Sequence, residues 1–134
     1  MTRVPPRPRV LLADDHARLR EALRDLLTET GFEVVAESGD GADAVAAARR
    51  LEPDIVVIDL RMPVLNGLDA TRLIRDARPA TQVVVLSAFE SPELERQARE
   101  AGAFAYLDKG TLARRVHRVL LEAAVHAVLA ARST

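Results

Sequence analysis

The sequence contains no cysteine and no tryptophan, and it has only one tyrosine and three phenylalanines. Without cysteine, neither a disulfide framework nor a thiolate metal site is available. The scarcity of aromatic rings argues against a surface that stacks nucleic-acid bases. The net charge of −1 gives no electrostatic reason for direct nucleic-acid binding either.

No apolar run is long enough to cross a bilayer, and residues 1–9 carry three prolines and three arginines where a signal peptide would be apolar. We therefore expect a cytoplasmic location without membrane contact. Residues 1–8 are expected to be a flexible lead with polyproline character. The rest, 9–134, is long enough to bury the core of one domain.

Lysine is almost absent, since eighteen of the nineteen basic residues are arginine and Lys109 is the exception. Either residue suits a solvated surface, but a compact ammonium in a confined site is not replaceable by a guanidinium. Lys109 follows the short apolar run 104–107. Taken alone, Lys109 would be interpreted as a surface lysine. A functional role depends on the polar residues at the ends of the other strands.

Short apolar runs, typical of buried strands, alternate with segments of helical spacing. The expected strands are 10–13, 32–36, 55–58, 83–86 and 104–107. The expected helices are 16–29, 43–51, 67–77, 92–101 and 112–131. Five alternations predict a parallel sheet with helices on both faces, and ligands of such sheets bind beyond the carboxyl ends of the strands.

Polar groups follow four of these strands, namely Asp14, Asp15, Asp59, Ser87 and Lys109. Three carboxylates brought together repel each other, and Mg²⁺, which prefers oxygen ligands, would relieve the repulsion. An aspartate can accept a phosphoryl group, while a hydroxyl and an ammonium neutralise its oxygens. Each residue alone has an ordinary structural explanation, such as a helix cap or a turn, but the combination favours a phosphoryl site.

Three motifs resemble those of the receiver domains of two-component response regulators. They are Leu12-Ala13-Asp14-Asp15-His16, the segment Asp59-Leu60-Arg61-Met62-Pro63-Val64-Leu65-Asn66-Gly67, and Ala105-Tyr106-Leu107-Asp108-Lys109. The resemblance extends from about residue 9 to about residue 121 and is strongest to the NarL/LuxR class, whose members usually carry a C-terminal DNA-binding helix-turn-helix. It implies a flavodoxin-like α/β fold, a doubly wound five-stranded parallel sheet of strand order 2-1-3-4-5 with helices on both faces.

The resemblance also implies roles for the strand-end residues. Asp59 would be the phosphoacceptor, which takes the phosphoryl group from a sensor histidine kinase. Asp15 would bind Mg²⁺ directly and Asp14 largely through water, with Asp59 and the backbone carbonyl of Arg61 as further ligands.

The remaining implied roles concern the bound phosphoryl group and the response to it. Ser87 and Lys109 would hold the phosphoryl oxygens, and Tyr106 would turn inward as a switch when Ser87 is drawn to the phosphate. Arg61 and Phe89 occupy the two variable positions that tune how fast the aspartyl phosphate hydrolyses.

Two residues beside Lys109 depart from the family pattern. Gly110 stands where a proline is common, which reduces the rigidity of the loop, and Asp108 stands where an apolar residue is common. We expect the Asp108 side chain to point to solvent. His16 is expected to be a capping or surface histidine rather than a metal ligand.

The output surface would comprise the helix 92–101, the strand 104–107 and the last helix. The last helix is apolar over more than one face, which predicts that its end pairs with a second copy in a homodimer or leads to an effector. The function would be control of transcription if a DNA-binding domain follows in the native gene. The alternative is a freestanding receiver that acts through protein–protein contacts.

Two other classes use related chemistry. A phosphohydrolase of the haloacid dehalogenase type has its nucleophile after the first strand, in an Asp-x-Asp pattern, which Asp14-Asp15-His16 lacks. A flavin-binding module needs a hydroxyl-rich loop there, and two aspartates would repel the flavin phosphate. We therefore expect neither an enzyme nor an organic cofactor.

Overall fold

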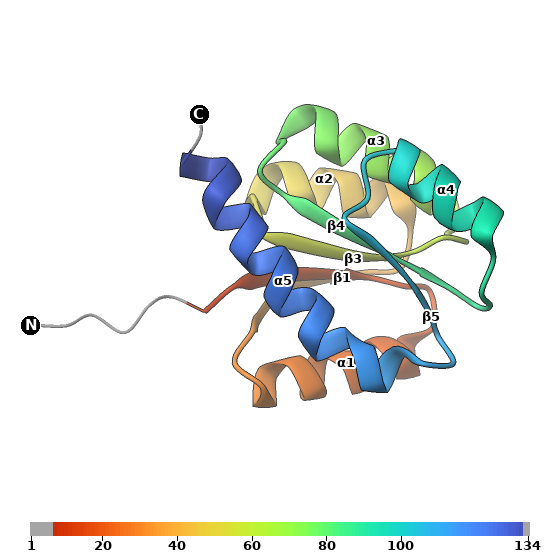
Figure 1. The fold of residues 1–134 in the computed structure, drawn as a ribbon, viewed down its shortest axis with the longest axis horizontal. Coiled ribbons are helices and arrows are strands. Elements are labelled where there is room, and N and C mark those ends of the chain that lie inside the picture. The colour runs from red at the N-terminus through yellow and green to blue at the C-terminus, as the bar shows by residue number, and fades with distance from the viewer. Residues whose placement is uncertain (1–6, 133–134) are drawn as a thin grey trace, which may run out of the picture.

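The computed structural model describes residues 7–132, so most of the expected flexible lead at 1–8 lies outside the described residues. Strands and helices alternate along the chain (Figure 1). The elements are β1 (Arg9–Ala13), α1 (Ala17–Glu29), β2 (Glu33–Ser38), α2 (Gly41–Leu51), β3 (Ile55–Asp59), α3 (Gly67–Ala77), β4 (Gln82–Ser87), α4 (Pro92–Glu100), β5 (Ala105–Asp108) and α5 (Leu112–Arg132). The five strands form one sheet of order β2-β1-β3-β4-β5, and every pair is parallel, which confirms the predicted fold class.

The two largest differences from the predicted boundaries have local causes. Helix α2 begins at Gly41 rather than 43, because the Asp40 side chain accepts a hydrogen bond from the backbone N–H of Asp43 and caps the helix there. Strand β2 ends at Ser38 rather than 36, because Glu37 and Ser38 still pair with Leu12 and Ala13 of β1. Phe32, just before the strand, is buried and packs edge-on against His117 of α5.

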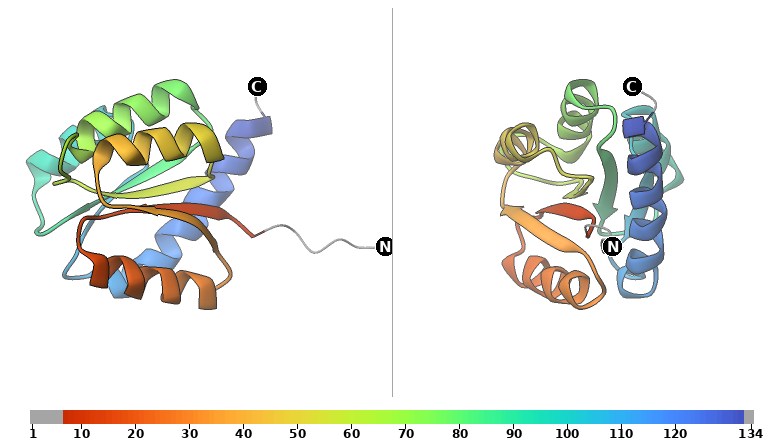
Figure 2. Two further views of the ribbon diagram at one scale, coloured as in Figure 1. Left: turned by 180° about the vertical axis from the view of Figure 1, so that it is seen from behind. Right: turned by 90° about the vertical axis from the view of Figure 1, so that its left-hand side faces the viewer.

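The helices cover the sheet in two layers (Figure 2). Alternate strand residues such as Val10 and Leu12 pack with α1 and α5, whereas Leu11 and Ala13 pack with α2 on the other face, which α3 and α4 also cover. Burial on both faces explains the continuous apolar runs of β1, β3 and β4. The strand order reverses between β1 and β3, so a crevice is expected at their carboxyl ends.

Helix α5 buries one stripe and exposes another. Leu112, Val116, Leu120, Ala123 and Ala127 are buried, while Leu121, Val125, Val128 and Leu129 are exposed. This second stripe accounts for the broad apolar pattern seen in the sequence. Within residues 7–132, no helix combines the length and hydropathy that a membrane span requires.

The loop between β3 and α3 contains Asn66-Gly67, two residues that tolerate a positive φ, but neither of them adopts one. Asn66 has φ −69° and caps α3, since its side chain accepts a hydrogen bond from the Asp69 N–H. The left-handed residue is Val64, with φ 70°. Gly67 is needed for space, because a Cβ at this position would lie 2.4 Å from the Asp59 carbonyl oxygen.

We therefore expect Gly67→Ala to destabilise the fold, because backbone rather than a movable side chain would have to shift. The loss in the free energy of unfolding should be about 1–3 kcal/mol, as for other overpacked sites, and urea denaturation measures it. Gly39→Ala is the matched control, because a Cβ there meets only the end of the Arg20 side chain at 3.6 Å. Equal losses in the two variants would contradict the steric explanation.

Candidate functional site

The polar residues predicted at the strand ends lie together at the carboxyl edge of the sheet. Asp59 and Ser87 end β3 and β4, and Lys109 directly follows β5. Asp14 and Asp15 follow β1. All of them except Asp14 line a hollow of about 340 Å³, to which His16 and Phe89 also contribute.

Lys109 links two buried carboxylates. Its Nζ lies 3.0 Å from Asp14 Oδ2 and 3.2 Å from Asp59 Oδ2. The backbone fixes this position, because the Lys109 N–H donates to the Ser87 carbonyl at 2.7 Å. Burial lowers the pKa of Lys109, but the Asp14 and Asp59 carboxylates outweigh it, so the pKa is raised and the side chain stays an ammonium.

Asp59 carries an incompletely compensated charge. Burial and, to a lesser extent, the neighbouring Asp14 carboxylate raise the pKa of Asp59, while Lys109 and the Arg61 N–H oppose the shift. Asp59 Oδ2 contacts Lys109, but the hydrogen bond recorded for Oδ1 is a long one of 3.4 Å from the Arg61 N–H. Oδ1 is thus weakly held beside the hollow.

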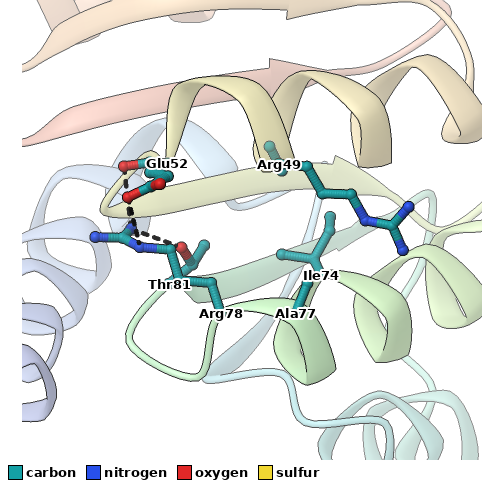
Figure 3. A pocket seen from close by; sticks show the side chains of 7 residues that line it. Arg49, Glu52, Ile74, Ala77, Arg78 and Thr81 are labelled. Carbon is teal, nitrogen blue, oxygen red and sulfur yellow. Dashed lines mark hydrogen bonds and ion pairs between the residues drawn. The ribbon is translucent and has the colours of Figure 1, made fainter. Parts of the chain in front are cut away.

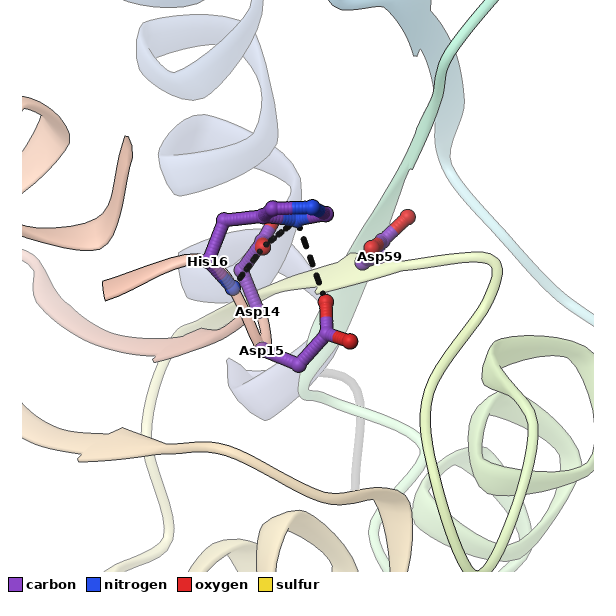
Figure 4. Close-up of side chains that lie close together, drawn as sticks. All are labelled: Asp14, Asp15, His16 and Asp59. Carbon is purple, nitrogen blue, oxygen red and sulfur yellow. Dashed lines mark hydrogen bonds and ion pairs between the residues drawn. The ribbon is translucent and has the colours of Figure 1, made fainter. Parts of the chain in front are cut away.

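His16 lies against the acidic pair, as Figure 4 shows. Its Nδ1 is 3.0 Å from Asp14 Oδ1 and 3.1 Å from Asp15 Oδ1. His16 stands at the N-cap of α1 and 68% of its side chain is exposed, which agrees with the expectation of a capping or surface histidine. Its ring accepts no hydrogen bond from a backbone N–H of the helix.

Ser87 and Tyr106 converge on the segment after β4. The Ser87 hydroxyl, which is buried, accepts a hydrogen bond of 3.5 Å from the Phe89 N–H, and the Tyr106 hydroxyl donates to the Phe89 carbonyl at 2.9 Å. Tyr106 is buried on the α2–α4 face of the sheet. The Arg61 guanidinium lies over the Phe89 ring, 5.8 Å from its centroid, a contact between two loops that sequence reasoning missed.

The prediction that Asp108 points to solvent is wrong. Its side chain is buried and accepts hydrogen bonds from the Thr111 N–H at 3.1 Å and the Thr111 hydroxyl at 2.8 Å. The bond from the hydroxyl is the main cause of a lowered pKa of Asp108. The carboxylate therefore stabilises the turn into α5, and Lys109 contacts Asp14 and Asp59 instead.

The acidic cluster fits a hard divalent cation. Oxygens of Asp14, Asp15 and Asp59 and a ring nitrogen of His16 all lie within 4.8 Å of one another. The Lys109 ammonium pairs with two of these carboxylates, Asp14 and Asp59. Among residues 7–132, buried Asp14 Oδ2 has no hydrogen bond besides this ion pair. A cation with oxygen ligands would neutralise the remaining charge, which suits Mg²⁺.

A second hollow, of about 240 Å³, lies between α2 and the end of α3 (Figure 3). Its Arg78 guanidinium donates to the Pro53 carbonyl and the Thr81 hydroxyl and pairs with Glu52. These polar groups satisfy one another, so the hollow offers no comparable set of reactive side chains.

Residues 10–121 match the family model of the response regulator receiver domain. The chain is 46% identical over 101 residues to the transcriptional regulatory protein PdtaR of Mycobacterium tuberculosis, covering 75% of this chain and 49% of that protein. It is 39% identical over 101 residues to the chemotaxis protein CheY of Thermotoga maritima, covering 75% and 84%. The solved receiver domain of the Mycobacterium tuberculosis response regulator NarL is 30% identical, with a TM-score of 0.85, covering 90% of this chain and 98% of that one.

The chain therefore belongs to the receiver-domain family of two-component response regulators, as its motifs predicted, and neighbours of the NarL/LuxR class are among its structural matches. It spans about half the length of PdtaR, a transcriptional regulator. The curated relatives include transcriptional regulatory proteins and the chemotaxis protein CheY.

The raised pKa of Asp59 predicts a pH-dependent cost to stability. The folded protein binds the proton of the Asp59 carboxyl more tightly than the unfolded chain does. The free energy of unfolding therefore falls as the pH rises from the ordinary aspartate pKa, about 3.9, through the higher pKa of Asp59 in the folded state. With EDTA present, Asp59→Asn should therefore be more stable than the wild type at pH 7, and the difference should vanish at acidic pH. Chemical denaturation across pH measures it.

Asp25→Asn, which changes an exposed carboxylate on α1, is the control and should show no such pH-dependent gain. A less stable Asp59→Asn variant at pH 7 would mean that its ion pair with Lys109 outweighs burial, contrary to this interpretation.

Proposed function

We propose that the protein is phosphorylated on Asp59, in a reaction that requires Mg²⁺, by a sensor histidine kinase. The observation that carries the proposal is the state of the Asp59 carboxylate. It is buried at 4% exposure, one oxygen contacts the Lys109 ammonium, and the other is weakly held beside an open hollow. A carboxylate nucleophile needs this combination of a fixed orientation and an oxygen with an available lone pair.

In the proposed reaction an Asp59 carboxylate oxygen attacks the phosphorus of a phosphohistidine. The P–O bond forms as the P–N bond breaks, and the leaving imidazole keeps the electron pair and takes up a proton. Lys109, and the Ser87 hydroxyl after a small movement, neutralise the phosphoryl oxygens. The cation, held by Asp15, Asp59 and the Arg61 carbonyl with Asp14 acting through water, would supply further charge neutralisation. Arg61 and Phe89, stacked at the mouth, would tune access of the water that hydrolyses the product.

The response would pass through Ser87 to Tyr106. When the Ser87 hydroxyl turns toward the phosphoryl group, it leaves the Phe89 N–H, and the segment that receives the Tyr106 hydrogen bond is free to shift. Tyr106 can then settle further inward and change the surface of α4, β5 and α5. Such a change follows if the phosphoryl group contacts one state better than the other.

The proposal includes a cytoplasmic location, a homodimer or an effector as the partner of the α4–β5–α5 surface, and control of transcription if a DNA-binding domain follows in the native gene. It includes no direct nucleic-acid binding by this domain and no membrane contact. It also includes no organic cofactor and no enzymatic turnover of an outside substrate, because the phosphoryl group ends on the protein's own carboxylate.

Incubation with acetyl phosphate and Mg²⁺ should add the mass of one phosphoryl group to the intact protein. Asp59→Asn, which keeps the shape of the side chain but loses the nucleophilic carboxylate, should gain nothing. Intact-protein mass spectrometry, with and without EDTA, is the measurement. Asp25→Asn serves as the matched control and should be modified like the wild type, because this carboxylate is exposed on α1.

An undiminished mass gain in Asp59→Asn would place the phosphoryl group elsewhere. If the wild type gains no mass and binds no beryllofluoride either, the chain is a receiver that has lost phosphoacceptor chemistry.

Ser87→Ala should still be phosphorylated but should respond weakly, because the hydroxyl that couples the phosphoryl group to Tyr106 is missing. Tyr106 is the only tyrosine and there is no tryptophan, so the intrinsic fluorescence of the protein reports this side chain alone. We expect beryllofluoride to change the fluorescence of the wild type and to change that of Ser87→Ala far less. Equal responses, or equal loss of phosphorylation and response, would contradict the switch assignment.

A further inference from the structure

His16 places an imidazole beside the carboxylates of the proposed cation site, and this inference rests on that proposed function. The ring lies at the rim, largely exposed, with its Nδ1 within 3.1 Å of an oxygen of Asp14 and of Asp15. The backbone N–H of His16 also donates to Asp14 Oδ1 at 2.7 Å. The backbone at the N-cap therefore anchors the residue, while the ring is held by these two carboxylates.

The short distances from His16 Nδ1 to the carboxylate oxygens of Asp14 and Asp15 limit what can lie between these three atoms. Carboxylate oxygens only accept hydrogen bonds, so a bare Nδ1 lone pair at this distance would be repelled by both. The ring nitrogen and the two carboxylate oxygens are close enough to share one cation. The exposed ring can adjust its position at this rim without disturbing the core.

The distances allow a shared ion. A ring nitrogen of His16 lies within 4.8 Å of the carboxylate oxygens, including that of Asp59. Two ligands on opposite sides of one ion stand about 4 Å apart when each bond is about 2.0–2.2 Å. A small inward movement of an exposed side chain therefore suffices. Asp14 Oδ2 is buried and, within the part of the chain that the structure describes, has no hydrogen bond besides its ion pair with Lys109, so it adds negative charge behind the site.

We propose that His16 is a metal-selectivity residue: its imidazole becomes a direct ligand of first-row transition ions, so that the site binds them in preference to Mg²⁺. Magnesium takes oxygen ligands and gains little from an imidazole, whereas transition ions take both, with affinities that rise along the first row. Asp15 and Asp59 would hold either kind of ion. Only the transition ions would recruit the ring.

The test measures binding of Co²⁺ and of Mg²⁺ to the full chain by titration calorimetry. The variants are His16→Ala and His16→Asn, since asparagine can still donate a hydrogen bond to the acidic pair but has no imidazole. We expect both to weaken Co²⁺ binding by about 10- to 100-fold and to change Mg²⁺ binding less than about threefold. In the wild type, Co²⁺ should strongly shift the NMR signals of the His16 ring. The visible absorption spectrum of bound Co²⁺ should differ between the wild type and both His16 variants.

His126→Ala is the matched control, because His126 is an exposed histidine on α5 that should leave both affinities unchanged. Asp15→Asn should weaken both ions. If the His16 variants lose Co²⁺ and Mg²⁺ affinity equally, the ring only positions Asp15 and the inference is overturned. Unchanged Co²⁺ binding overturns it as well. If the wild type binds Co²⁺ but no Mg²⁺, the proposed function fails while the role of His16 stands.

Discussion

The ion contacts of Lys109 are the constraint on which the site depends. Two carboxylates almost without solvent exposure, Asp14 and Asp59, face one another at the ends of adjacent strands, and one ammonium lies between them. Burying unpaired charges is costly, so the ammonium must be held in place. The sheet holds it in place, because Lys109 directly follows β5 and its backbone N–H donates a hydrogen bond to the carbonyl of Ser87 at the end of β4. A parallel sheet is thus what allows charged residues from the ends of three strands to form one cluster.

The cluster remains unbalanced, and the proposed function depends on this imbalance. One ammonium and three carboxylates make a site that would repel further anions unless a cation is bound. In the proposed reaction the phosphoryl group adds negative charge, so its binding would depend on both Lys109 and the cation. Burial and, to a lesser extent, the Asp14 carboxylate raise the pKa of Asp59, so we expect the charged site without a cation to lower the stability of the fold. Stability and reactivity are therefore set by the same few contacts.

The fold was predictable because each central strand is apolar on both faces and each connection between a strand and a helix contains a turn or capping residue. The gathering of Asp14, Asp59, Ser87 and Lys109 was predictable for the related reason that parallel strands end at one edge. The side-chain details were not. The positive φ of Val64, the burial of Asp108 by Thr111 and the stacking of Arg61 on Phe89 depend on contacts between loops, which no period in the sequence encodes.

The scarcity of lysine has a consequence for covalent chemistry. Lys109 is the only side-chain primary amine, and it is a protonated, ion-paired and therefore poor nucleophile. Acylating reagents that modify most proteins at many surface positions would find one shielded target here, at the centre of the acidic cluster. A protein of this composition can be attached or labelled through its α-amino group with little competition. Any acyl group that did reach Lys109 would remove the charge that holds Asp14 and Asp59 together.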